Sequence, residues 1–338
     1  MDNVTHTLAA LALSRAGLNR TTRFATLALV VGANLPDIDV LSSLGGSVTY
    51  LKCHRGITHS ILGVTVLAAL LAGILYYLAR RFPPTKKGGP TLHVPWLLGI
   101  CWIATASHLV LDFTNSYGVR PFLPFSSRWY AWDIMFIVDP LLLGMLALGL
   151  AVPALLGLIS EEVGARKPAT RRGAILALIG LVLLLGLRDF AHRRVLQRLD
   201  SRTYYEENPQ RVAAFPTVVN PFSWVGVVET ASAFHVLAVS AFDSEVNADR
   251  LRVFHKPEPS RALDAALATR TARVFAGFAR FLWVRVEENE DGYQATLRDL
   301  RYASPDGLRP AFAVDIKLDK NLAVRSESLG LSGTKNER

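Results

Sequence analysis

The sequence contains few cysteines and few charged residues. Its 338 residues include two cysteines, Cys53 and Cys101, too few to hold a chain of this length together by disulfides. Only 19% of the residues are charged and 51% are hydrophobic, which excludes an intrinsically disordered chain. The formal net charge of +9 is common in nucleic-acid-binding proteins. The basic residues, however, lie between apolar segments, so we expect no nucleic-acid partner.

Long apolar segments predict a part of the chain that is embedded in a membrane. Residues 61–79 and 94–113 each approach the roughly 20 residues that a helix needs to cross a bilayer. Residues 134–159 and the shorter segment 173–187 are two further predicted spans. Together they predict an α-helical integral membrane domain with about four spanning helices.

Two shorter apolar segments precede these spans. Residues 4–13 and 24–35 are below spanning length and are separated by a polar stretch that contains Gly17. We expect them to form an N-terminal helical hairpin packed against the spanning helices. The predicted membrane domain therefore covers residues 1–192.

The composition changes after residue 190. From about residue 200 the chain is charged and alternates between apolar and polar residues, which is typical of strands. Residues 260–278 instead show helical spacing. We predict a soluble α+β domain over residues 200–332, with strands at 224–229, 235–242, 281–287, 294–300 and 311–318. Glu290, Asp291 and Gly292 form a predicted turn between two of these strands.

The basic residues predict an orientation in the membrane, because cytoplasmic loops collect Lys and Arg. One alternate set of loops carries eleven basic residues and the other set carries four. The larger set comprises Arg15, Arg20, Arg23, Arg80, Arg81, Lys86, Lys87, Arg166, Lys167, Arg171 and Arg172. Placing this set inside predicts a multi-pass protein of the cytoplasmic (inner) membrane whose C-terminal domain is extracytoplasmic.

Ionisable residues cluster at the opposite ends of the predicted helices, where they are candidates for function. With the predicted orientation they all lie at the same membrane face. They are His6, Asp37, Asp39, His54, His59, His108 and Asp112. His108 and Asp112 are four residues apart, so a helix presents both on one face.

Imidazole and carboxylate groups without thiolates suit zinc, manganese or iron, and zinc is the commonest hydrolytic ion of this kind. Seven such groups are too many for one tetrahedral ion with an open position, but they suit two metals. Each patch has an ordinary explanation too: a single membrane histidine often bonds a neighbouring helix, and Asp37 follows Pro36, where turns are common. Asp133 and Asp139 are either residues that orient the histidines or helix caps.

Five stretches of the first 145 residues resemble segments of a known family, and they occur in the same order as in that family. They are MDNVTHTLAALALSRAGL, NLPDIDVL, HRGITHSILG, SHLVLDFTNSYGVRPFLPFS and WYAWDIMFIVDPLLL. The resemblance is to the YdjM-type membrane-bound metal-dependent hydrolases, also described as LexA-binding, inner membrane-associated hydrolases. It implies a bacterial or archaeal membrane hydrolase that uses all seven residues above as metal ligands. Of these, Asp37, His59 and Asp112 are the predicted catalytic residues.

Two functions follow as hypotheses. The first is a membrane-bound hydrolase that acts on a phospholipid or another membrane-borne phosphoester. Its site lies at the membrane interface and holds one or two divalent ions, with zinc as the favoured metal. The second is a non-catalytic membrane scaffold or regulator in which the same residues form a structural or sensing metal site. Bound metal without turnover of any ester would distinguish the second hypothesis from the first.

Overall fold

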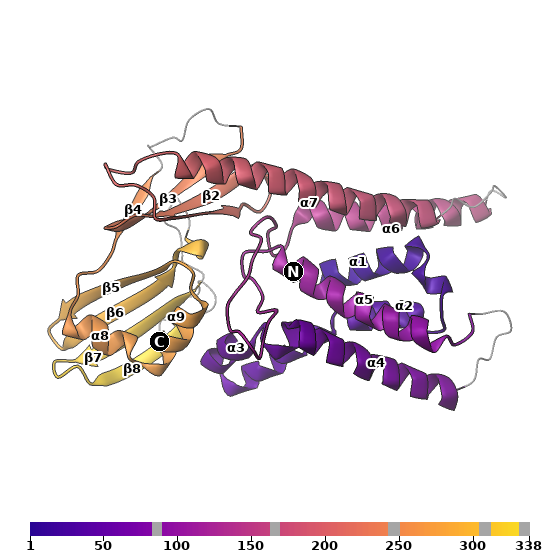
Figure 1. The fold of residues 1–338 in the computed structure, drawn as a ribbon, viewed down its shortest axis with the longest axis horizontal. Coiled ribbons are helices and arrows are strands. Elements are labelled where there is room, and N and C mark those ends of the chain that lie inside the picture. The colour runs from indigo at the N-terminus through magenta and orange to yellow at the C-terminus, as the bar shows by residue number, and fades with distance from the viewer. Residues whose placement is uncertain (83–89, 163–169, 243–250, 304–311, 331–338) are drawn as a thin grey trace. The chain divides into compact units, whose positions relative to one another are not determined.

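The computed structural model describes residues 1–82, 90–162, 170–242, 251–303 and 312–330 (Figure 1). The chain separates into two compact units. The first, here called the helical unit, comprises Met1–Asp39 and Arg55–Asp189. The second, the C-terminal unit, comprises Val40–His54 and Phe190–Arg338.

The helical unit is built from six helices, of which the last continues beyond it. They are α1 (Asn3–Ala16), α2 (Ala25–Gly32), α4 (Ile61–Arg81), α5 (Val94–Phe113), α6 (Pro140–Glu162) and α7 (Thr170–Asp200). Small side chains let these helices approach closely. A Cβ atom on Gly32 of α2 would lie 2.7 Å from the Cβ of Ala104 on α5. Ala28, Ala68 and Ala104 are fully or almost fully buried in the same core.

Five segments of the described chain are long and apolar enough to cross a membrane. Four of them contain α4, α5, α6 and α7, which confirms the predicted spans. The fifth is Ala25–Gly45. The sequence prediction judged residues 24–35 too short to span, but α2 is followed directly by 3-10 turns over Leu35–Gly45, called η2 here.

The third predicted span begins later in the structure than in the sequence prediction. Residues 134–139 are not helical, and Met135 forms a bridge with Asn115 instead. Helix α6 begins at Pro140. Helical geometry is disfavoured for Asp139 because it precedes a proline, whereas proline itself suits the first position of a helix. The Asp139 carboxylate accepts a hydrogen bond from the Leu142 amide at 3.0 Å and so caps the helix.

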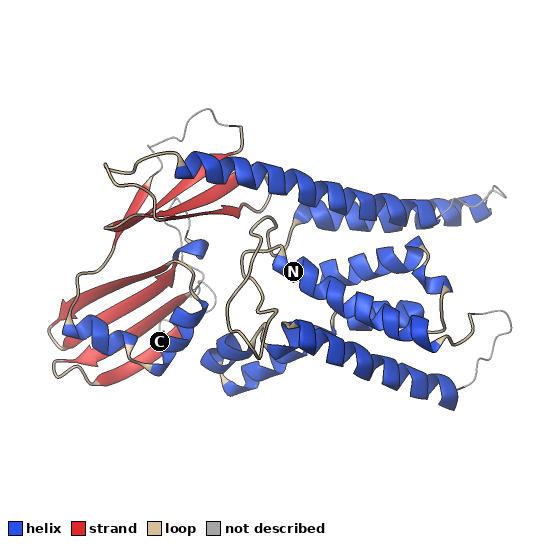
Figure 2. Ribbon diagram, viewed as in Figure 1, coloured by secondary structure: helices blue, strands red, loops and turns tan. Residues whose placement is uncertain are grey.

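The C-terminal unit contains two four-stranded antiparallel sheets, shown in red in Figure 2. The first has the order β1 (Arg211–Pro216), β2 (Ser223–Glu229), β3 (Ala233–Ser240) and β4 (Arg252–His255). The second has the order β5 (Leu282–Asn289), β6 (Gly292–Asp299), β7 (Ala313–Asp319) and β8 (Val324–Gly330). A short helix, α3 (Ser47–Cys53), packs against α9 and β8 of this unit.

The five predicted strands correspond to β2, β3, β5, β6 and β7, whereas the sequence prediction missed β1, β4 and β8. The predicted hairpin turn is present between β5 and β6, where Gly292 has a φ of 143°. The predicted helix over residues 260–278 is divided into α8 (Arg261–Leu267) and α9 (Arg270–Phe278). The Thr269 hydroxyl accepts a hydrogen bond from the Ala272 amide and starts the second helix.

Candidate metal centre

Four of the seven predicted ligands converge in the helical unit. Asp37 lies on η2, His59 ends a short 3-10 turn (Ile57–His59), and His108 and Asp112 lie on the last turns of α5. One ligating atom from each lies within 4.8 Å of the others, although the residues span 76 positions of sequence. Such a group can hold one divalent ion.

The His108 ring is oriented for metal binding. Its Nδ1 lies 2.7 Å from the carbonyl oxygen of Ala33. A carbonyl only accepts, so Nδ1 carries the proton and Nε2 presents its lone pair. This Nε2 lies 3.4 Å from Asp112 Oδ2 and 3.0 Å from His59 Nε2. A metal-binding histidine usually donates its other ring N–H to a carbonyl or carboxylate in this way, which fixes the tautomer and leaves the second nitrogen for the ion.

His59 is surrounded by carboxylates. Its Nδ1 lies 3.2 Å from Asp39 Oδ2, and its Nε2 lies 3.3 Å from Asp37 Oδ1 and 3.4 Å from Asp112 Oδ2. Burial by itself would lower the pKa of His59, but the nearby carboxylates of Asp112, Asp37 and Asp39 outweigh it and raise the pKa to about 10. The carboxylates therefore favour a positive charge at this point.

His6 lies beside the group of four. Its ring stacks on that of His108 with the centroids 3.9 Å apart, and its Nε2 lies 3.4 Å from Asp112 Oδ1. Burial lowers its pKa to about 4, so the ring is neutral at pH 7. Within the described part of the chain, both ring nitrogens of His6 and Asp112 Oδ2 are buried without hydrogen-bond partners. Buried polar atoms are normally paired, so these atoms and their chemistry fit a divalent ion.

The other two predicted ligands take different places. Asp39 lies against the back of His59, where its Oδ2 also accepts a hydrogen bond from the Arg55 amide at 2.8 Å. It orients the imidazole in this position. His54 belongs to the C-terminal unit, and its ring stacks on Tyr50 at 4.6 Å. Its role as a ligand stays a prediction.

Asp139 is the capping residue at the start of α6. In addition to capping α6, its Oδ2 lies 2.7 Å from Arg188 Nη2 of α7, and both side chains are fully buried. This ion pair joins α6 to α7 inside the helical unit. Asp133 is buried, and its backbone adopts a left-handed φ of 61°.

Two contacts to Asp112 were not predicted from the sequence. The amino group of Met1 contacts Asp112 Oδ1. Arg55 Nη2 donates to the same oxygen at 2.9 Å. Arg55 is 4% exposed, and its position between two histidines of the HRGITHS stretch is the one sequence signal that points to it.

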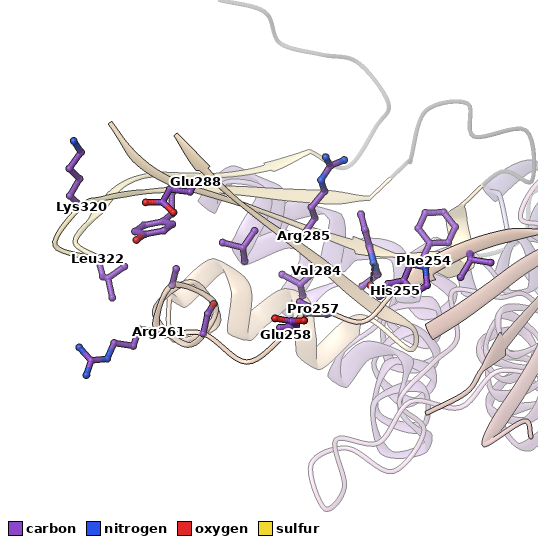
Figure 3. A pocket seen from close by; sticks show the side chains of 16 residues that line it. Phe254, His255, Pro257, Glu258, Arg261, Val284, Arg285, Glu288, Lys320 and Leu322 are labelled. Atoms are coloured by element: carbon purple, nitrogen blue, oxygen red, sulfur yellow. Dashed lines mark hydrogen bonds between the residues drawn. The ribbon is translucent and has the colours of Figure 1, made fainter. Parts of the chain in front are cut away.

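The C-terminal unit has a separate open groove of about 810 Å³ (Figure 3). Its lining includes Val284 and Arg285 of β5, Phe254 of β4 and Leu322 of the turn before β8. None of the seven predicted ligands lines this groove.

Comparison with known proteins identifies the family. The family model described as "YdjM inner membrane protein" matches residues 1–195, more than half of the chain. The chain belongs to the YdjM family. All four residues of the metal-binding group lie in the part that matches YdjM. The family and the five candidate spans make it a membrane protein of the inner-membrane YdjM type.

A second family model matches part of the C-terminal unit. A model described as "YfhP C-terminal alpha/beta plait domain" matches residues 261–337. Over most of its length this YdjM family member is similar to "Uncharacterized protein YfhP" of Bacillus subtilis (strain 168). The two are 26% identical, and the match covers 90% of this chain and 84% of the relative. No solved structure matches the chain.

Proposed function

We propose that this protein is a membrane-bound metal-dependent hydrolase that acts on a membrane-borne phosphoester, such as a phospholipid. The observation that carries the proposal is the convergence of Asp37, His59, His108 and Asp112 within 4.8 Å of one another. One of the unpartnered ring nitrogens of His6 beside this group can supply a further ligand atom, which suits one or two ions, with zinc the first candidate.

Each residue has a definite task in this proposal. His59, His108, Asp37 and Asp112 hold the ion, and Asp39 keeps the His59 ring in place. When bound, a divalent ion of this kind acidifies water and polarises a phosphoryl or carbonyl oxygen. The side chain of Asp37 is 19% exposed, whereas those of His59 and Asp112 are at most 1% exposed. The Asp37 side is therefore where we expect substrate and water to enter.

The depth of the site favours a substrate that is carried by the membrane. His108 and Asp112 lie at the last turns of α5, and His59 lies just before the first residue of α4. Both positions are at the ends of candidate spans. A headgroup ester can therefore reach the site from the bilayer surface, without extraction of the lipid.

Contacts at the opposite ends of the helices support the predicted orientation. Arg171 donates to the carbonyl of Ala16 at 2.8 Å, and Arg23 donates to the carbonyls of Ala79 and Phe82. These contacts join three of the basic loops that the charge bias assigns to the cytoplasm; Lys86, Lys87, Arg166 and Lys167 lie outside the described residues. We propose that the metal group faces the outer side and that the C-terminal unit is extracytoplasmic.

The test combines metal analysis with hydrolysis by purified protein in detergent. We expect wild-type protein to retain one or two zinc-type ions and to hydrolyse a member of a panel of lipid phosphoesters. The variant His108→Ala should lose more than about 100-fold in metal affinity, because even groups that only support a ligand contribute 10–100-fold. Hydrolysis should be lost with the metal.

The matched control is His93→Ala, because His93 is an exposed histidine at the start of α5. It should keep both the metal and the activity. A wild-type protein that retains metal but hydrolyses no ester of the panel would favour the scaffold or sensor function. A protein that binds no divalent ion would overturn both.

A further inference from the structure

Arg55 contacts two of the three carboxylates that surround His59. Its backbone amide donates to Asp39 Oδ2 at 2.8 Å, and its guanidinium donates to Asp112 Oδ1 at 2.9 Å. Asp39 contacts one nitrogen of His59 and Asp112 contacts the other. One residue thus touches both carboxylates that hold this ring from opposite sides.

The guanidinium is itself held by the loop that follows α5. Arg55 Nη1 lies 3.0 Å from Asn115 Oδ1, 3.1 Å from the Gly118 carbonyl oxygen and 3.4 Å from the Asp112 carbonyl oxygen. The Tyr117 ring lies 4.8 Å from the guanidinium carbon. A planar group with several donors in a fixed arrangement is well suited to such a position, and an ammonium group is not.

These contacts give the two carboxylate oxygens of Asp112 different surroundings. Oδ1 is the oxygen that receives Arg55 and contacts the amino group of Met1. Oδ2 is buried, has no hydrogen-bond partner among the described residues, and lies 3.4 Å from the Nε2 atoms of both His59 and His108. With Oδ1 occupied by these contacts, Oδ2 is the oxygen directed at the histidines.

We propose that Arg55 is a positioning residue of the metal centre: it fixes Asp112 so that Oδ2 alone faces the ion, and it fixes Asp39 behind His59. Arg55 touches neither the ion nor the substrate in this role. The inference rests on the proposed function, because it assigns Arg55 a part in holding the same ion.

The test measures metal affinity by competition with a chelator, in addition to activity. Arg55→Lys keeps the positive charge but cannot donate to Asp112, Asn115 and Gly118 together. We expect it to weaken metal binding by about 10–100-fold, the usual effect of losing a group that orients a ligand. The activity at saturating metal should fall mainly in kcat, because the substrate contacts remain.

A second pair of variants tests the same role without changing Arg55. Asn115→Ala removes one acceptor from Nη1 and should weaken metal binding in the same direction but less. Asn115→Asp restores an acceptor and should return the affinity to near the wild-type value. Arg128→Lys is the matched control, because Arg128 is exposed and lies over Tyr130, 5.4 Å from its ring centre; it should bind metal as wild type does.

The outcomes separate this inference from the proposed function. If wild-type protein binds metal and Arg55→Lys and Asn115→Ala bind it equally tightly, the positioning role is wrong while the metal site stands. If wild-type protein binds no metal, the proposed function fails first. If Arg55→Lys does not fold, the weakened binding of Asn115→Ala and its recovery in Asn115→Asp decide the question.

Discussion

Buried charges occur in both units, but they are paired to different degrees. In the C-terminal unit, Asp299 is 1% exposed and Arg301 is 4% exposed. Asp299 accepts hydrogen bonds from the amides of Arg280, Phe281 and Arg301, and from Arg301 Nε at 2.7 Å. Arg301 also donates to the Phe278 carbonyl at 2.9 Å. Every oxygen of this carboxylate therefore has a protein partner.

The candidate metal-binding group of the helical unit is also largely buried, but it is incompletely paired. Asp112 Oδ2 and the His6 ring nitrogens have no hydrogen-bond partner among the described residues. Leaving a buried polar atom unpaired costs roughly 1–3 kcal/mol. A fully paired buried charge stabilises one fold, whereas an incompletely paired group keeps donor atoms available for a ligand. This difference distinguishes the Asp299–Arg301 pair from the candidate metal-binding group.

The strongest test of this comparison replaces one carboxylate in each unit. Asp299→Asn leaves Arg301 buried without its counter-charge and should lower the free energy of unfolding by about 3–5 kcal/mol, with metal binding unchanged. Asp37→Asn should instead reduce metal affinity more than about 100-fold, since ligands contribute more than supporting groups, and should change stability little. Chemical unfolding and chelator competition measure the two effects. Equal losses of stability in both variants would contradict the comparison.

The pH dependence of metal binding provides a second test. His59, with its pKa raised to about 10, is protonated at neutral pH and must lose a proton when it binds metal. Below that pKa, the fraction of neutral His59 grows tenfold for each unit by which the pH rises. His6, with its pKa lowered to about 4, is already neutral and adds no slope. Apparent affinity should therefore rise at least about 100-fold from pH 6 to pH 8.

Chelator competition at several pH values, with the pH dependence of the chelator taken into account, measures this slope. An affinity that stays flat over the same range would show that His59 does not exchange its proton for the ion.

The smallest expected effect comes from an exposed ion pair in the C-terminal unit. Arg285 and Glu287 lie on β5 in contact with each other, and their side chains are 61% and 51% exposed. Exposed pairs contribute about 0–1 kcal/mol. Arg285→Ala should therefore change the unfolding free energy by less than about 1 kcal/mol. A larger loss would mean that burial alone does not set the cost of losing a charge in this unit.

The shared position of the candidate ligands could be predicted because membrane helices restrict where polar residues lie. His59, His108 and Asp112 lie at helix ends that the apolar runs delimit, and the spacing of four places His108 and Asp112 on one face. Asp37 could be assigned to the same membrane end as them. Their approach to within 4.8 Å depends on helix packing, which periodicity does not encode.

The contacts that depend on loops could not be predicted. Arg55 has a left-handed φ of 50° and reaches Asn115 and Gly118, about 60 residues away in sequence. From the sequence, Arg55 was only one more basic residue in a loop. The division of the helix over residues 260–278 was missed because the apolar spacing continues through Thr269, which serves as a cap. Strands β1, β4 and β8 were missed as well, and β8 is largely exposed and therefore lacks an apolar face.

The ion pair between Asp139 and Arg188 has a consequence for how the protein is made. Arg188 lies just past the apolar segment 173–187, and an arginine in a membrane helix is costly unless it is paired. Paired with Asp139, Arg188 is neutralised and fully buried. We therefore expect α6 to remain near the translocation machinery until α7 emerges, so that the two helices enter the lipid as a hairpin.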